Sequence, residues 1–181
     1  MTQLAGDNMK KINTKSITLS SILCAISLTM FVIESQIPLP IAIPGVKLGI
    51  ANTVTLFALL YLPFREALLI LLGRIILGSI FASNPSIIIY SLSGGLLSIL
   101  GEWIILKLTS KKFVVEISII GAMLHNIGQL LCAAIITGTA YVFTYLPLLL
   151  IAGIISGAFC GLCVLGVDKV IGSAIIKLLK N

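Results

Sequence analysis

The sequence predicts an all-α integral membrane protein, a bundle of six transmembrane helices with both termini in the cytoplasm. The 181 residues have a mean hydropathy of +1.20, and 59% are hydrophobic while only 10% are charged. A soluble domain carries about 25% charged residues. The apolar residues also fall into six segments, separated by proline, glycine and charged residues, and most segments are long enough to cross a bilayer.

The six segments define the expected domain organisation. We expect residues 1–15 to be a disordered cytoplasmic N-terminus, 16–171 to be the transmembrane domain and 172–181 to be a cytoplasmic tail. The predicted helices span residues of about 16–33, 48–61, 66–82, 86–108, 114–137 and 147–167. The second is shorter than the ~20 residues that a span requires. It must be completed by loop residues or be buried in the bundle.

A proline-rich loop at about 34–48 separates the first two predicted helices. Pro38, Pro40 and Pro44 exclude a continuous helix, because proline lacks an N–H group and clashes with the preceding turn. Lys47 and Asn52 follow directly. We therefore predict a structured loop at one membrane face that carries polar groups toward a cavity between helices.

Lysine and arginine placement predicts the orientation. With the N-terminus in the cytoplasm, ten of the twelve basic residues face the cytoplasm. They are Lys10, Lys11, Lys15, Arg65, Lys107, Lys111, Lys112, Lys169, Lys177 and Lys180. The bias indicates a multi-pass protein of the cytoplasmic (inner) membrane of a bacterium, with the proline-rich loop outside.

Small residues recur every fourth position in two predicted helices. Gly153, Gly157 and Gly161 form a glycine stripe in the last helix. Ser21, Ala25 and Thr29 form a Ser-Ala-Thr stripe in the first. Such spacing lets helix backbones approach closely. Both stripes fit packing within the bundle, and the Ser-Ala-Thr stripe also fits docking of another membrane subunit.

Arg74 is an ionisable residue inside a predicted span and therefore a candidate functional residue. It requires a carboxylate, carbonyl groups, water or an anionic ligand. A structural pair with Glu102 in the fourth helix is one alternative. The other is a cavity in which Arg74 meets an anionic substrate.

A second polar cluster, His125, Asn126 and Gln129, lies in the fifth helix. Residues three and four apart adjoin on a helix, so these side chains are expected to project into the bundle. They fit either a hydrogen-bond network that fixes helix packing or a polar wall of a substrate pocket.

Lys47 and Asn52 complete the predicted substrate-binding set. Lys47 is either a solvated residue at the membrane face or a ligand contact, and Glu34 at the end of the first helix is a candidate partner for it. Lys47 and Arg74 favour a solute with an anionic group.

Several classes of site are not predicted. The sequence has no nucleotide-binding GxxxxGK[ST] loop and no HExxH motif, and we expect no catalytic residues, metal or cofactor. No basic run with interleaved aromatics indicates nucleic acid. The four cysteines lie in apolar runs and are expected to be inert thiols. They are Cys24, Cys132, Cys160 and Cys163.

Four motifs together resemble a known membrane family. They are PGVKLGIAN at 44–52, GRIILGSIF at 73–81, SLSGGLLS at 91–98 and GAMLHNIGQLLCAA at 121–134. The chain resembles the family labelled both Gx transporter and heptaprenyl diphosphate synthase component I. That family in turn resembles the substrate-binding (S) components of energy-coupling factor (ECF) transporters.

The resemblance implies a six-helix S component with an outer pocket beneath its first loop. Such a subunit would associate with lipid, a transmembrane T subunit and two cytoplasmic ATPase subunits, and would bind a small solute. The implied T-subunit contact uses small residues of the first helix, although Ser21, Ala25 and Thr29 depart from the paired alanines of that family. Vitamin, flavin and isoprenoid ligands stay open. The alternative function is an accessory subunit of heptaprenyl diphosphate or quinone synthesis that binds a prenyl diphosphate.

Overall fold

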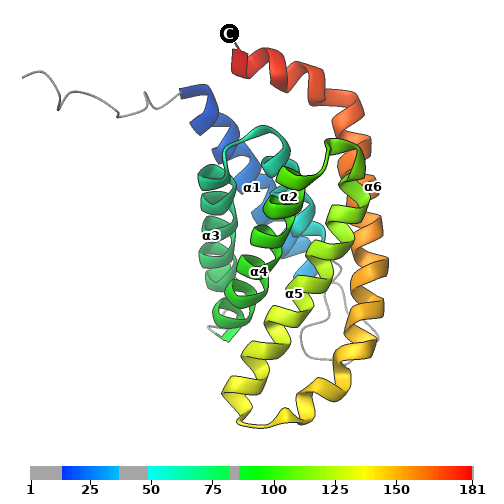
Figure 1. Ribbon diagram of the computed structural model, residues 1–181. Coiled ribbons are helices and arrows are strands. Elements are labelled where there is room, and N and C mark those ends of the chain that lie inside the picture. The colour runs from blue at the N-terminus through cyan, green and yellow to red at the C-terminus, as the bar shows by residue number, and fades with distance from the viewer. Residues whose placement is uncertain (1–13, 37–48, 82–85, 181) are drawn as a thin grey trace, which may run out of the picture.

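A computed structural model describes residues 14–36, 49–81 and 86–180, and these parts of the chain form a helical bundle without strands (Figure 1). The helices are α1 (Thr14–Gln36), α2 (Ile50–Tyr61), α3 (Phe64–Phe81), α4 (Ser86–Leu108), α5 (Val114–Thr137) and α6 (Leu146–Lys180). Two short 3-10 helices, η1 (Lys111–Phe113) and η2 (Ala140–Tyr145), precede α5 and α6. The all-α prediction is confirmed for the described residues.

Four of the described helical segments are long and apolar enough to cross a membrane. They comprise most of α1 and α4, η1 with α5, and η2 with most of α6. The 12 residues of α2 rise about 18 Å, well short of the ~30 Å hydrocarbon core. The 18-residue α3 contains three charged residues, Arg65, Glu66 and Arg74. The structure therefore supports a multi-pass membrane protein, and the count of six spans stays a prediction.

The segment predicted to be a cytoplasmic tail continues α6 as helix up to Lys180. Gly172 and Ile175 are buried, and Leu179 packs against the core. Tyr61 at the end of α2 donates a hydrogen bond to Asp168, which ties this part of α6 to the bundle. Its last turns bend toward the start of α1 (Figure 1).

Proline and glycine set the ends of the short helix α2. Gly49 precedes it with φ of 72°, a left-handed conformation that costs glycine little. At its other end the chain turns at Pro63, whose carbonyl oxygen accepts hydrogen bonds from the N–H groups of Glu66 and Ala67. Ala51 in its first turn is buried and its carbonyl oxygen accepts a hydrogen bond from the Ser27 hydroxyl of α1, so this turn lies inside the bundle.

An apolar core joins the helices of the bundle. Its largest fully buried side chains come from five helices: Leu56, Ile70, Leu71, Ile99, Ile117, Val114 and Val164. Large apolar side chains such as Ile80, Ile135 and Val170 are exposed on the outside of the bundle. This arrangement is typical of a protein whose surroundings are lipid.

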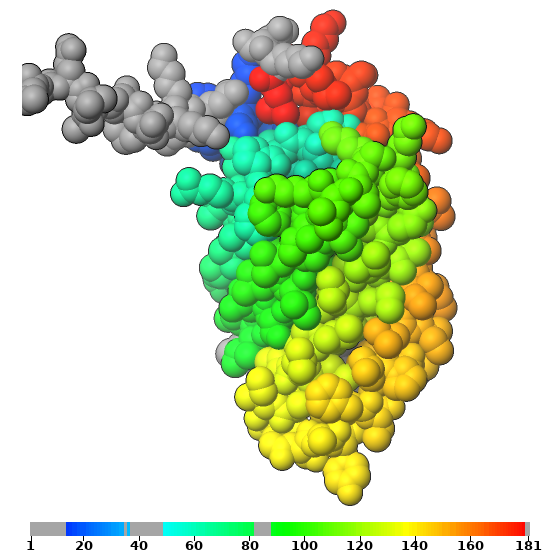
Figure 2. Space-filling view, viewed as in Figure 1, coloured from blue at the N-terminus to red at the C-terminus, as the bar shows by residue number. Residues whose placement is uncertain are grey.

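The described basic residues other than Arg74 lie at one end of the bundle. They occur at the starts of α1 and α3, at the end of α4, in η1 and in the last turns of α6: Lys15, Arg65, Lys107, Lys111, Lys112, Lys169 and Lys177. These places share the upper end in Figure 1. At the opposite end the turn between α5 and α6 extends beyond α3 and α4 (Figure 2).

The glycine stripe packs against α5. A Cβ atom at Gly157 would lie 2.6 Å from the Ile119 Cα atom, and one at Gly161 would lie 2.7 Å from the Val115 Cα atom. No side chain fits between these backbones. The prediction that these small residues pack helices within the bundle is therefore confirmed.

Candidate functional site

Arg74 is the charged centre of the candidate site. It lies on α3 and only 5% of its side chain surface is exposed. Its Nη2 atom donates a hydrogen bond of 3.1 Å to the Asn52 Oδ1 atom. Its Nε atom is buried without a hydrogen-bond partner among the described residues. A guanidinium group stays charged in proteins, so Arg74 has a neutral partner and an unused donor.

The end of α1 and the start of α2 form the next wall. Glu34 is buried, and its Oε1 atom accepts a 2.7 Å hydrogen bond from the Gly49 N–H group. The Gly49 carbonyl in turn accepts a bond of 2.8 Å from the Asn52 N–H group. A carboxylate at the N-terminus of a helix is stabilised by the helix dipole. These contacts place Asn52 beside Arg74 and hold Glu34 inside the bundle.

Two residues of the polar cluster of α5, Asn126 and Gln129, lie in different environments. Asn126 is buried and its Nδ2 atom donates a 2.7 Å hydrogen bond to the Leu149 carbonyl oxygen of α6. Gln129 is also buried, but its side chain lies close to Gly94 of α4. Asn126 and Gln129 therefore both contribute to helix packing, against different neighbours.

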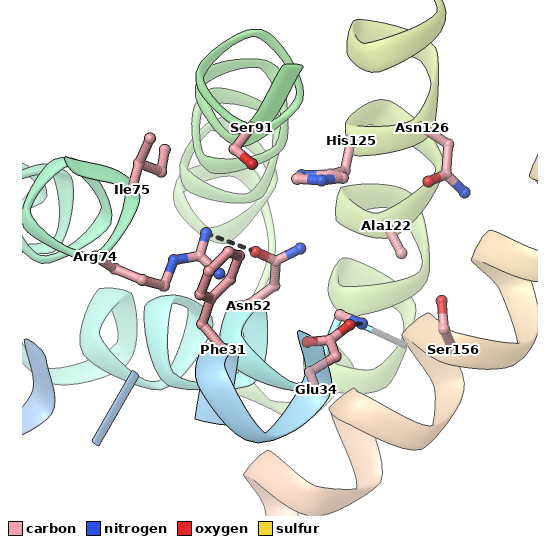
Figure 3. A pocket seen from close by; sticks show the side chains of 11 residues that line it. Phe31, Glu34, Asn52, Arg74, Ile75, Ser91, Ala122, His125, Asn126 and Ser156 are labelled. Atoms are coloured by element: carbon pink, nitrogen blue, oxygen red, sulfur yellow. Dashed lines mark hydrogen bonds between the residues drawn. The ribbon is translucent and has the colours of Figure 1, made fainter. Parts of the chain in front are cut away.

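A cavity of about 40 Å³ lies between the helices at this level (Figure 3). All six helices contribute to its wall. The lining residues are Phe31, Glu34, Gly49, Asn52, Arg74, Ile75, Ser91, Ala122, His125, Asn126 and Ser156. A water molecule needs about 10–15 Å³ of such space. The cavity thus has room for about three water molecules or one small molecule.

Four of the six predicted substrate-binding residues line this one cavity. They are Asn52, Arg74, His125 and Asn126. Gln129 is not among the lining residues, and Lys47 lies outside the described part of the chain. The pairing of Lys47 with Glu34 stays a prediction for the same reason.

Sequence reasoning missed Phe31, Glu34, Ser91 and Ser156 as lining residues. Glu34 carried a usable signal, because it is an acidic residue at the end of an apolar run and its burial cost makes it a candidate. The two serines carried none, since serine is common at helix contacts within membranes.

The structural pair between Arg74 and Glu102 is not formed. Glu102 is buried on α4, accepts a 3.3 Å hydrogen bond from the Ser98 hydroxyl and lies against Gly121 of α5. Within the described ranges, the hydrogen bond of Arg74 goes to Asn52 and no ion pair joins it to Glu102. Arg74 lines the cavity instead, and its contact with an anionic substrate stays a prediction.

The Ser-Ala-Thr stripe lies on the outside of α1. Ser21, Ala25 and Thr29 are all exposed. The Thr29 hydroxyl donates a 2.9 Å hydrogen bond to the Ala25 carbonyl oxygen of its own helix. The stripe therefore does not pack helices within the described bundle, and its role as a docking surface stays a prediction.

Comparison with known proteins gives one result. Searches of curated proteins and of solved structures found no match. Residues 23–166, most of the helical bundle, match a protein family. The chain belongs to the family described as heptaprenyl diphosphate synthase component I.

Proposed function

We propose that this protein is the solute-binding membrane subunit of an ECF-type transporter. One observation carries the proposal: a cavity inside an apolar bundle is lined by a buried guanidinium group whose Nε donor has no hydrogen-bond partner among the described residues. A charged group in a membrane protein is costly to bury and occurs chiefly where function requires it. An anionic group of a solute would satisfy the Nε donor that no described residue satisfies.

The position of the cavity supports uptake from outside. The basic end of the bundle would face the cytoplasm by the positive-inside rule. The cavity lies at the start of α2 and near the end of α1, where Glu34 lines it, and this part of the bundle is away from the basic end. A solute arriving from outside a bacterial inner membrane would thus reach Arg74 without crossing the core.

Transport would require partner subunits. The sequence has no nucleotide-binding loop, so the energy must come from two cytoplasmic ATPase subunits that act through a T subunit. The exposed Ser-Ala-Thr stripe offers small side chains over which helices of a T subunit would approach closely.

The family description favours a second candidate function, an accessory role in heptaprenyl diphosphate synthesis. In that role Arg74 would contact the diphosphate of a prenyl substrate, and the cavity would open sideways to lipid. The observed cavity is small and lies between all six helices. This geometry supports the solute-binding function over the prenyl-binding one.

Native mass spectrometry of the protein purified from its own membrane tests the proposal. We expect a co-purifying small molecule that is lost in Arg74→Ala. Arg65→Ala is the matched control, because Arg65 lies on the same helix but is exposed at the basic end. It should keep the ligand.

The outcomes separate the functions. A bound solute of water-soluble character supports the transporter proposal, and a prenyl diphosphate supports the second candidate. Absence of any ligand from the wild-type protein, with equal thermal stability of wild type and Arg74→Ala, would reject both.

A further inference from the structure

Two opposite charges line the cavity without forming an ion pair. Arg74 is 5% exposed and Glu34 is 7% exposed, and both belong to the lining. Each has a neutral hydrogen-bond partner: the Asn52 side chain for Arg74 and the Gly49 N–H group for Glu34. In Figure 3 the Glu34 carboxylate lies apart from the Arg74 guanidinium.

This separation is unusual for buried charges. In a medium of low dielectric, opposite charges attract strongly, and an unpaired buried charge is costly. Here the Asn52 amide holds one nitrogen of the guanidinium group, and the start of α2 holds the carboxylate. The protein thus fixes the two charges in the wall of one cavity. The side chains of Asn52 and Phe31 lie between them (Figure 3).

We infer that the cavity binds a small zwitterion, with its anionic group at Arg74 and its cationic group at Glu34. This inference rests on the proposed solute-binding function and specifies its substrate class. The site carries formal charges of +1 and −1, so a zwitterion neutralises both. A simple anion would face the Glu34 carboxylate, and a simple cation would face the Arg74 guanidinium, which disfavours each.

The cavity also limits the size of the zwitterion. Its volume of about 40 Å³ corresponds to a few water molecules. This suits a molecule with a few heavy atoms between its charged groups and excludes a ring system of vitamin size unless the helices move apart.

A panel of small zwitterions and singly charged fragments tests the inference on the full-length protein in detergent. The zwitterions are glycine, β-alanine and 4-aminobutyrate, which differ in charge separation. Acetate and methylammonium each present one half of glycine. Binding is measured as the shift of the thermal unfolding midpoint with probe concentration. We expect at least one zwitterion to raise the midpoint and neither half-molecule to do so.

Two conservative variants assign the ends of the ligand. Glu34→Gln keeps an oxygen that accepts the Gly49 N–H bond, and Arg74→Gln removes the positive charge while keeping a donor. Each should weaken zwitterion binding about tenfold or more, since a hydrogen bond to a charged group is worth about 1.5–3 kcal/mol. Arg65→Gln, at the exposed basic end, should leave binding unchanged.

The inference is overturned if no zwitterion shifts the midpoint, or if acetate binds as well as glycine and Glu34→Gln has no effect. Native mass spectrometry separates this failure from failure of the proposed function. A co-purified solute that depends on Arg74 but has no cationic group would keep the solute-binding function and reject the zwitterion.

Discussion

The Ser-Ala-Thr stripe of α1 and the glycine stripe of α6 have the same four-residue spacing but different surroundings. All three glycines are buried, and Gly157 and Gly161 lie against the backbone of α5. The residues of the α1 stripe are exposed. The four-residue spacing therefore indicates that another helix can approach closely. It does not indicate whether that helix belongs to the same bundle or to a partner.

The two helices differ in what fills their buried faces. On α1 the buried face carries Leu19, Leu23, Ser27 and Phe31, and it packs against α2 and α3. The residues of the Ser-Ala-Thr stripe lie on the exposed side of the helix. On α6 the small residues themselves form the buried face toward α5. The comparison suggests that the glycine stripe serves stability and that the Ser-Ala-Thr stripe is available to a partner.

The largest expected effect comes from Gly157→Val. A Cβ atom there would lie 2.6 Å from Ile119 Cα and 2.8 Å from the Ser118 carbonyl oxygen, so α5 and α6 must separate. We expect a loss of about 3 kcal/mol or more, at or above the upper range for overpacked cores, or failure to fold. Thermal unfolding in detergent measures it.

Gly166→Val is the matched control, because a Cβ atom at Gly166 meets nothing within 4 Å on the same helix. Its stability should stay within about 0.5 kcal/mol of the wild type. Equal destabilisation by both variants would mean that glycine is needed for helix flexibility. It would contradict the interpretation that the glycine stripe serves close packing of α6 against α5.

An intermediate effect is expected for Gly153→Ala. Its Cβ atom would lie 3.0 Å from the Asn126 Nδ2 atom and 3.3 Å from the Met123 N atom. A side-chain amide can shift more easily than backbone, so we expect a cost of about 1 kcal/mol. The same unfolding assay applies, with Gly166→Ala as the control. A cost as large as that of Gly157→Val would show that Asn126 is held rigidly.

The smallest effect on stability is expected for Ala25→Leu. Ala25 is exposed, so the free energy of unfolding should change by less than about 0.5 kcal/mol. Co-purification of T and ATPase subunits, identified by mass spectrometry, should be lost if they dock here.

Ile104→Ala on the exposed face of α4 changes side-chain size by the same number of carbons in the opposite direction, away from the stripe, and should retain the partners. Retention of the partners by Ala25→Leu as well would remove the docking role of the Ser-Ala-Thr stripe.

Much of the bundle follows from local sequence signals. The predicted ranges 86–108 and 114–137 coincide with α4 and α5, and the predicted end of the second helix at residue 61 is the end of α2. The length of α6 was not predictable in this way. Its continuation to Lys180 depends on contacts of Asp168 and Ile175 with the end of the bundle, and these partners are distant in sequence.

The candidate site shows the same division. Burial cost singled out Arg74, Asn52, His125 and Asn126 from the sequence, because polar residues are conspicuous in apolar helices. Whether Arg74 meets Glu102, and whether Gln129 joins the site, depends on how α3, α4 and α5 are rotated about their axes. Periodicity gives no such rotation for helices that are apolar on nearly every side.

The sequence by itself determined the membrane class, the helical segments and the gathering of basic residues at one end, because composition and breakers act locally. Only the tertiary structure decided that Glu34 lies in the same cavity as Arg74 and that the Ser-Ala-Thr stripe faces outward. The reason is physical: hydropathy determines what must leave water, whereas side-chain packing between helices determines which polar groups meet.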